Sequence, residues 1–309
     1  MTADEKLAAI LAAVQTDPGH RGLARDPHDN LFIATAGDFQ AACRSVSDTL
    51  LPIVDVVTGF VIPTAEPPTF ETDGPLGAVF LACALAMLDT HVSLTSDPGC
   101  VTALNSGLLM AYPDAEPDVV QRTTFGGPRV RGHTQRRWVF PTHVVALERV
   151  GPAFDGRSRT MRGRDITDLM LPAERIVAPG AFHPAEPRTI GIGDGGNEIG
   201  MGKISHETIV KNIPNGDLIH CRVPTDHLIV AGVSNWGAYA LAAGVYVLRG
   251  VTPPPDLFDP DREREILDVM VREGPLVDGV TGKQTATVDG LTWEEYAKPL
   301  IRIREILGS

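Results

Sequence analysis

Short apolar runs alternate with longer apolar segments along the first half of the chain. The short runs predict buried strands at 53–57, 91–95 and 142–147. Segments with apolar residues at helical spacing predict helices at 3–15 and 75–88, and the second is apolar nearly all round, as in a buried helix. A strand, a helix and a second strand in this order are typical of a parallel or mixed sheet.

The second half continues the alternation and ends in helices. We therefore predict an α/β fold, with a mixed, mostly parallel sheet flanked by helices in layers and a single domain over residues 1–309. Thr292 and Glu295 fit a capping box at the start of the last helix. The remaining predicted elements are strands at 189–193, 218–221 and 228–233, a short helix at 206–211, and helices at 234–248, 261–273 and 293–307.

Residues 113–140 differ from the rest because arginines are concentrated among glycines and prolines. Charge runs usually lie on solvated faces, which favours a solvated hairpin or insertion. The alternative is a basic arm over an acidic substrate or a partner subunit. The arginines in question are Arg122, Arg129, Arg131, Arg136 and Arg137.

Composition removes several classes of function. The net charge of −12 and the pI near 5.2 argue against nucleic acid as a partner, because phosphate binding requires a basic face. Four cysteines without a CxxC pair predict neither a zinc site nor a disulfide framework, and we expect a reduced, cytoplasmic protein. The first residues lack the basic and long apolar regions of a secretory signal.

One uncharged stretch, 228–248, has the length of a membrane span. Its middle is polar, with Ser234, Asn235 and a glycine, so a strand followed by a turn and a buried helix explains it better. We expect no membrane partner. A homo-oligomer remains compatible with the sequence.

The glycine-rich segment GIGDGGNEIGMG, residues 191–202, admits three interpretations. Its glycines match the G-x-G-x-x-G pattern of nucleotide-binding loops, but Asp194 within it would repel a pyrophosphate and no helix follows at once. A glycine turn with solvated acids is the second interpretation. The third is a metal site, because Asp194 ends a buried strand and Asn197 and Glu198 add oxygen ligands of the kind that Mg²⁺ and Mn²⁺ prefer.

A second acidic loop supports the metal interpretation. Glu71 and Asp73 follow the strand at 53–57 and precede the apolar helix, so both loops should open on the same edge of the sheet. Taken alone, Asp73 is better explained as a helix cap than as a metal ligand. Thr58 and Gly59 would line the same edge.

Further candidates lie on the predicted edge. Ser234 and Asn235 either cap the helix that follows them or bind a substrate carboxylate. Glu148, at the end of the strand 142–147, is a candidate acid, or half of a surface ion pair with Arg149. Among the histidines, His143 and His206 are the candidates, because each lies close to an acidic motif in the sequence.

Several motifs occur together in one order along nearly the whole chain, from about residue 21 to the C-terminus. They are TGF, ETDGPLGA, ALERVGPAFDG with MRGRDI, GIGDGGNEIGMG, AGVSNWGAYAL and VDGVTGKQTATVDGL. This set resembles the C-terminal domain of D-glutamate cyclase. The resemblance implies a metal-assisted α/β domain that closes D-glutamate to 5-oxo-D-proline with loss of water. Vertebrate members carry a further N-terminal domain that is not expected here, and the arginine-rich segment has no counterpart among the shared motifs.

These observations give one working hypothesis for the site. We expect an amino dicarboxylate as the substrate and a divalent cation, Mg²⁺ or Mn²⁺, as the cofactor, because a cation can neutralise a carboxylate and polarise its C–O bond. The expected metal ligands are Asp73, Asp194 and Glu198; the candidate catalytic residues are Glu71, Glu148 and His143; and the substrate-binding residues are Thr58, Gly59, Asn197, Ser234 and Asn235.

Two alternatives remain open at this point. A metal-dependent phosphohydrolase would use the same acids, with arginines from the segment 122–137 to hold phosphate. A non-catalytic module would bind a metal or a carboxylate without turnover.

Overall fold

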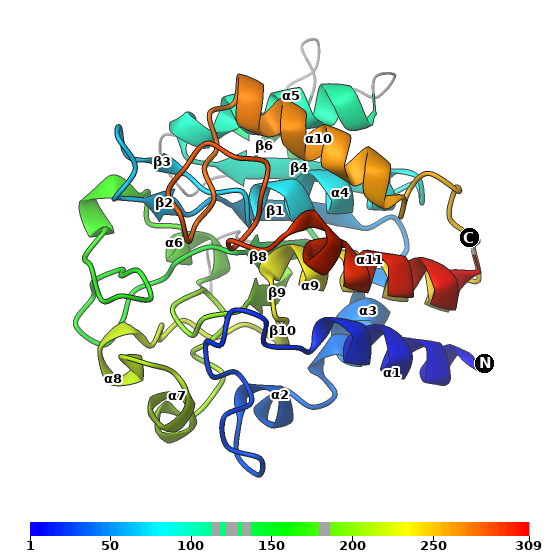
Figure 1. Ribbon diagram of the computed structural model, residues 1–309. Helices are drawn as coiled ribbons and strands as arrows, with labels where there is room; N and C mark the ends of the chain where they lie inside the picture. The colour runs from blue at the N-terminus through cyan, green and yellow to red at the C-terminus, as the bar shows by residue number, and fades with distance from the viewer. Residues whose placement is uncertain (113–117, 122–128, 132–136, 179–185, 309) are drawn as a thin grey trace.

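A six-stranded sheet forms the centre of the molecule, in the order β10-β9-β8-β1-β4-β5 (Figure 1). The computed structural model describes residues 1–112, 118–121, 129–131, 137–178 and 186–308. Every pair of neighbouring strands in this sheet is parallel. The strands are β1 (Ile53–Thr58), β4 (His91–Ser96), β5 (Asp118–Gln121), β8 (His143–Leu147), β9 (Arg188–Gly193) and β10 (His227–Val230).

The strand order reverses between β1 and β8. From β1 the chain adds β4 and then β5 on one side, whereas β8, β9 and β10 are added in turn on the other side. In open parallel sheets the crevice at such a reversal, outside the carboxyl ends of the strands, is where ligands bind. The topology therefore directs attention to the residues that follow β1, β8 and β9.

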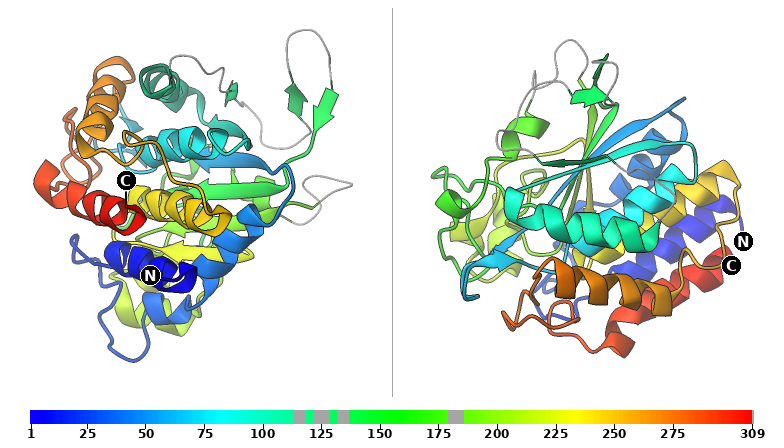
Figure 2. Two further views of the ribbon diagram at one scale, coloured as in Figure 1. Left: turned by 90° about the vertical axis from the view of Figure 1, so that its right-hand side faces the viewer. Right: turned by 90° about the horizontal axis from the view of Figure 1, so that it is seen from above.

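The long helices pack together on one face of the sheet, as the left panel of Figure 2 shows. The predicted apolar helix, α4, has every residue from Pro75 to Leu85 buried, because it lies between the sheet and the outer helices. The helices of this layer are α1 (Ala3–Val14), α3 (Asp38–Ser47), α4 (Pro75–Ala86), α5 (Val101–Ala111), α9 (Ser234–Arg249), α10 (Pro260–Glu273) and α11 (Trp293–Leu307).

Loops and short elements cover the opposite face with two smaller apolar clusters. Val144 and Ala146 of β8 point into one of them, whereas Val145 and Leu147 point into the main core, as alternation along a strand requires. The short elements of the fold are α2 (Leu31–Ala34), α6 (Glu174–Val177), α7 (His206–Asn212), α8 (Gly216–Ile219), the 3-10 turns η1 (Pro98–Cys100) and η2 (Thr167–Leu169), and the two-stranded ribbons β2 (Val61–Ile62) with β3 (Thr69–Phe70) and β6 (Arg129–Arg131) with β7 (Arg137–Val139).

The predicted layered α/β fold is confirmed, with one element wrong. The segment 218–221 is predicted as a strand, but it contains the end of helix α8. At the start of α8, Asn215 adopts a left-handed conformation and Gly216 packs closely on the backbone of Ile209. The chain turns here at once after α7, which leaves no room for a strand. The expected capping box of α11 is present.

The uncharged stretch 228–248 forms β10 and the buried helix α9, as predicted. Within the described residues, no helix combines the length and apolarity needed to cross a membrane. Of the arginine-rich segment, the described parts form β5 and the β6–β7 ribbon, while Arg122 and Arg136 lie outside the described residues. The single-domain prediction stays a prediction.

A buried polar network links three helices of the main core. The Tyr239 hydroxyl on α9 lies 2.7 Å from the Glu263 carboxylate on α10 and 2.7 Å from the Tyr296 hydroxyl on α11. Burial raises the pKa of Tyr296 well above its ordinary value, and the charge of Glu263 raises it further. Burial raises the pKa of Glu263 to about 8.

Replacement of Glu263 by Gln should make the stability less dependent on pH. The folded-state pKa of Glu263 is about 8 and exceeds its ordinary value of 4.5, so its contribution is fully present below pH 4.5 and is lost as the pH rises through 8. As the pH rises from 5 to 9, the unfolding free energy should therefore fall less in E263Q than in the wild type. The difference between the two decreases should be at least about 1.4 kcal/mol, which corresponds to one pKa unit. Urea unfolding at several pH values measures this.

The exposed Glu265→Gln, on the same helix, is the matched control and should follow the wild type. Parallel pH profiles of E263Q and the wild type would contradict the assignment of this titration to Glu263.

Candidate active site

Five buried carboxylates gather at the carboxyl edge of the sheet, at the predicted crevice. Asp73, Asp194 and Asp289 form one group whose oxygen atoms lie within 4.8 Å of one another, and Glu148, Asp194 and Glu198 form a second. Asp194 is common to both groups. The structure thus brings the two acidic loops together around Asp194, as the sequence predicts.

The glycine-rich loop is shaped by Glu198. One oxygen of its carboxylate accepts a hydrogen bond from the Asp194 N–H at 3.0 Å, and the other accepts one from the Gly196 N–H at 2.7 Å. Gly196 has a φ of 102°, and a side chain on Gly195 would lie 2.9 Å from the Glu198 carboxylate. The glycines are therefore needed for a backbone that folds back on Glu198, which fixes the position of Asp194.

The second loop is fixed by mutual capping of two helices. The Asp73 carboxylate accepts hydrogen bonds from the Ser234 and Asn235 N–H groups at the start of α9, at 3.0 and 2.8 Å. The Asn235 amide oxygen accepts hydrogen bonds from the Gly74 and Gly77 N–H groups at the start of α4, at 2.8 and 2.7 Å. The idea that Asp73 caps α4 is therefore wrong: each side chain caps the other helix, and both helix N-termini point at the site.

Glu148 lies where β8 ends, with a positive φ of 43°. Its carboxylate accepts a short hydrogen bond from the Ser234 hydroxyl at 2.5 Å. A side chain on Gly74 would lie 2.7 Å from both Glu148 and Thr58, so this glycine lets the two loops meet. The surface ion pair with Arg149 is wrong, because Arg149 is fully buried and pairs with Asp97.

Asp289 is an acid that the sequence analysis missed. It lies in the loop between α10 and α11, a segment for which the sequence predicts no helix or strand. Asp278 organises this loop by accepting hydrogen bonds from the Thr281 and Gly290 N–H groups at 2.8 and 2.7 Å. The repeated Val-Asp-Gly in VDGVTGKQTATVDGL, which covers both aspartates, was the available signal.

Glu71 also belongs to this part of the site. A bridge between Glu71 and Val277 joins the two loops, and the Glu71 carboxylate packs so closely on Gly279 that no larger residue fits there. The charges of Asp73, Asp278 and Asp289 all act on Glu71. The loop between α10 and α11 therefore closes the acidic site from one side.

Arg21 is the second functional residue that the sequence analysis missed. Its guanidinium pairs with Asp194 and, at 2.8 Å, with Asp289. Asp17 holds the backbone beneath it by accepting hydrogen bonds from the Arg21 and Gly22 N–H groups, both at 2.8 Å. In the sequence, residue 21 marks only the start of the family resemblance.

The electrostatics follow from this crowding. Burial raises the pKa of Glu71, Glu148 and Asp194 well above their ordinary values, and neighbouring carboxylates raise each further. Burial and the charge of Asp289 raise the pKa of Asp73 to about 7, although hydrogen bonds from the α9 backbone oppose the shift. The Arg21 charge lowers the pKa of Glu71, Asp73 and Asp194, but one cation does not balance the cluster.

The other predicted residues divide between this edge and the rest of the molecule. Thr58, Gly59 and Asn197 lie at the edge, and Asn197 donates a hydrogen bond to the Arg159 carbonyl at 2.8 Å. His143 starts β8, at the opposite end of the strand from Glu148, and its ring bonds the Ser45 carbonyl at 3.0 Å. His206 contacts His220 instead of the acids.

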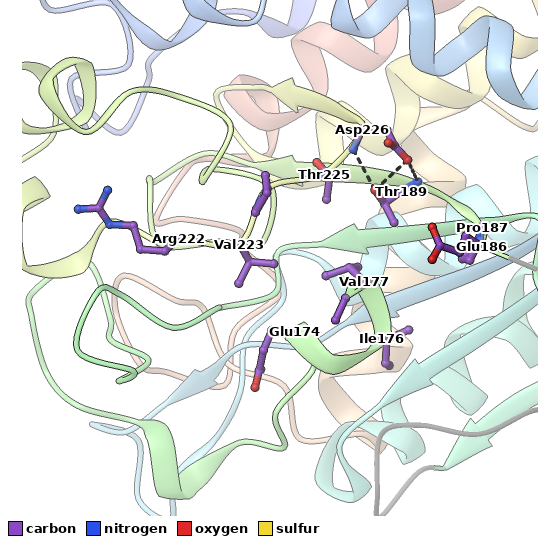
Figure 3. Close-up of a pocket in the computed structure, with 12 residues that line it drawn as sticks. Glu174, Ile176, Val177, Glu186, Pro187, Thr189, Arg222, Val223, Thr225 and Asp226 are labelled. Carbon is purple, nitrogen blue, oxygen red and sulfur yellow. Dashed lines mark hydrogen bonds between the residues drawn. The ribbon is translucent and has the colours of Figure 1, made fainter. Parts of the chain in front are cut away.

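Two cavities lie outside the acidic cluster. One of about 470 Å³ is lined by Thr189, Arg222 and Asp226 at the amino end of β9 and β10, the edge opposite to the acids (Figure 3). The Arg222 side chain points away from the Asp226–Thr189 contact in this view. The other cavity, of about 540 Å³, is lined by residues that include His20, Trp236 and Leu291. His20 and Trp236 are next to Arg21 and Asn235 in the sequence.

The donor set fits a divalent metal ion. Three buried oxygen atoms at this edge have no hydrogen-bond partner among the described residues, namely Thr58 Oγ1, Asn197 Oδ1 and Asp289 Oδ2. Carboxylate, amide and hydroxyl oxygens are the ligands of hard cations. A cation would also supply the positive charge that the cluster lacks.

Two comparisons with known proteins show the family of this chain. The model for the C-terminal part of D-glutamate cyclase-like proteins matches residues 10–304. The human mitochondrial D-glutamate cyclase is 31% identical over 264 residues, a match that covers 80% of this chain and 40% of the human protein. The chain therefore spans less than half the length of that relative. These matches show that the chain belongs to the D-glutamate cyclase-like family, in which it corresponds to the C-terminal domain.

Proposed function

We propose that this chain is a D-glutamate cyclase-like lyase that closes D-glutamate to 5-oxo-D-proline and water at the carboxylate cluster. The observation that carries the proposal is the gathering of Asp73, Asp194 and Asp289, with Glu148 and Glu198 beside them, at the strand-order reversal. A set of buried acids around one point is suited to a divalent cation and an anionic substrate together. The 31% identity to the human enzyme supports the reaction type.

Asp73, Asp194 and Asp289 would hold the cation, and Glu148 and Glu198 form a second group of carboxylates with Asp194. When bound, a divalent cation supplies charge neutralisation and polarisation of the reacting carboxylate. Asp73 and Asp194 are aimed inward by the start of α9 and by Glu198, so their positions do not depend on the ligand. This preorganisation lowers the cost of assembling the site.

Cyclisation forms a C–N bond between the substrate amine and its γ-carboxyl carbon, and one carboxyl oxygen leaves as water. The substrate ammonium must lose two protons to become the amide N–H, and the leaving oxygen must gain two protons to become water. Glu148 is suited to accept the amine proton, because burial raises its pKa and the Ser234 hydroxyl supports its ionised form. Glu71, whose pKa is raised by burial and by three neighbouring acids, is suited to donate a proton to the leaving oxygen.

The phosphohydrolase alternative is less favoured. A phosphate ester would bring further negative charge among the buried acids. Among the described residues, Arg21 is the cation that pairs with these acids, in ion pairs with Asp194 and Asp289. A non-catalytic metal-binding module uses the same ligands and differs only in turnover.

Replacing Asp194 with Asn should weaken Mg²⁺ and Mn²⁺ binding by at least about tenfold, because Asp194 belongs to both groups of carboxylates. Isothermal titration calorimetry measures the affinity, and circular dichroism checks the fold. The exposed Asp217→Asn on α8 is the control and should bind as the wild type does. Unchanged affinity in folded D194N would remove Asp194 from the ligand set.

Incubation with D- and L-glutamate, with and without EDTA, tests the reaction itself. We expect 5-oxo-D-proline from the D-enantiomer alone, loss of product with EDTA, and recovery with excess Mg²⁺ or Mn²⁺; chiral chromatography detects the product. Glu148→Gln should lower kcat by about 100-fold or more, the usual effect of removing a general base.

Tight metal binding without turnover of either enantiomer would favour the binding module over the cyclase. Hydrolysis of phosphate esters with Mn²⁺, without 5-oxoproline, would favour the phosphohydrolase.

A further inference from the structure

Arg21 places a positive charge next to the carboxylate cluster. Its guanidinium contacts Asp194 and Asp289, two of the three carboxylates in one of the groups that could hold a metal. It is also the cation whose charge lowers the pKa of Glu71, Asp73 and Asp194. Arg21 therefore stabilises the ionised form of the cluster.

We propose that Arg21 exchanges partners: it pairs with Asp194 and Asp289 until a divalent cation binds them, and it then receives the substrate carboxylate that does not react. The second half of this proposal rests on the proposed function, whereas the first half concerns the cation alone. The proposal makes Arg21 both a competitor of the cation and a residue that binds the substrate.

Competition follows from shared oxygen atoms. A Mg²⁺ or Mn²⁺ ion needs carboxylate oxygens at about 2.0–2.2 Å, and the oxygens of Asp194 and Asp289 are those that the guanidinium contacts. Two positive groups cannot both lie between these carboxylates, because they would repel each other at short range. The doubly charged ion gains more from the two carboxylates than the single charge of Arg21 does.

The surroundings of Arg21 allow its side chain to move while its backbone stays. Asp17 accepts hydrogen bonds from three successive N–H groups, from Arg21 to Leu23, which anchors the turn. The Arg21 side chain is 17% exposed, whereas those of Asp194 and Asp289 are 3% and 4% exposed. The guanidinium therefore lies on the outer side of the cluster, and His20 beside it lines the 540 Å³ cavity.

The chemistry of an amino dicarboxylate requires such a group. One carboxylate must reach the cation for the reaction, and the other meets a site lined by acids that repel it. A guanidinium offers two parallel N–H donors that match a carboxylate, and a displaced Arg21 would be at the edge of the site with its charge unpaired.

The test compares Arg21→Gln and Arg21→Lys with the wild type by calorimetry with Mn²⁺ alone. R21Q should bind Mn²⁺ about tenfold more tightly, because the competing charge is gone, and R21K should remain close to the wild type. The exposed Arg25→Gln is the control for loss of a positive charge nearby and should have no effect. Unchanged or weaker Mn²⁺ binding in folded R21Q would overturn the competition.

The second readout is binding of glutarate, a dicarboxylate that lacks the amine, to the Mn²⁺-loaded proteins. R21Q should lose at least about tenfold in glutarate affinity, and R21K should also lose affinity, because its single ammonium cannot form the two parallel bonds. Equal glutarate affinity in the wild type and R21Q would overturn the carboxylate role.

Steady-state kinetics extend the test to the reaction. In R21Q the KM for D-glutamate should rise at least about tenfold, with a smaller change in kcat, as expected for lost binding of a group that does not react. If the wild type binds glutarate through Arg21 but does not convert D-glutamate, the proposed function fails and the exchange stands. If R21Q does not fold, the glutarate affinity of R21K decides whether Arg21 binds the substrate carboxylate.

Discussion

The site depends on the mutual capping of α4 and α9. Asp73 satisfies the free N–H groups at the start of α9, and Asn235 satisfies those at the start of α4, so two helices are locked with their N-termini at one point. The partial positive charge of both N-termini helps to offset the burial of Asp73. Ser234, next to this contact, positions Glu148. The pair of side chains Asp73 and Asn235 thus fixes both helix N-termini and, through Ser234, the position of Glu148.

The accumulation of buried carboxylates sets the chemistry. Burial and neighbouring carboxylates raise the pKa of Glu71, Glu148 and Asp194, so the cluster is stable only with protons or positive charge. Arg21 provides part of that charge at the outer side. The same imbalance is the reason why the cluster is suited to the proposed divalent cation.

The sequence predicted much of this arrangement because strand ends are recognisable. Three apolar runs predict strands, at 53–57, 142–147 and 189–193. Thr58, Glu148 and Asp194 come directly after them, at the carboxyl ends of the strands, and parallel strands bring such ends to one edge. Arg21 and Asp289 escaped prediction because they come from loops beyond the sheet. No periodic pattern fixes where a loop folds back, and His143 was chosen only for its closeness in sequence to Glu148.

By itself, the sequence determined the class of fold, the burial of α4, the acidic character of two loops and the family, since hydrophobic period and motif order are local properties. The tertiary structure alone decided which acids share one point, that Asp73 caps α9 instead of its own helix, and that Arg21 pairs with Asp194 and Asp289. Contacts between residues more than 150 positions apart follow from how the layers pack, and that packing is settled only when the whole chain has folded.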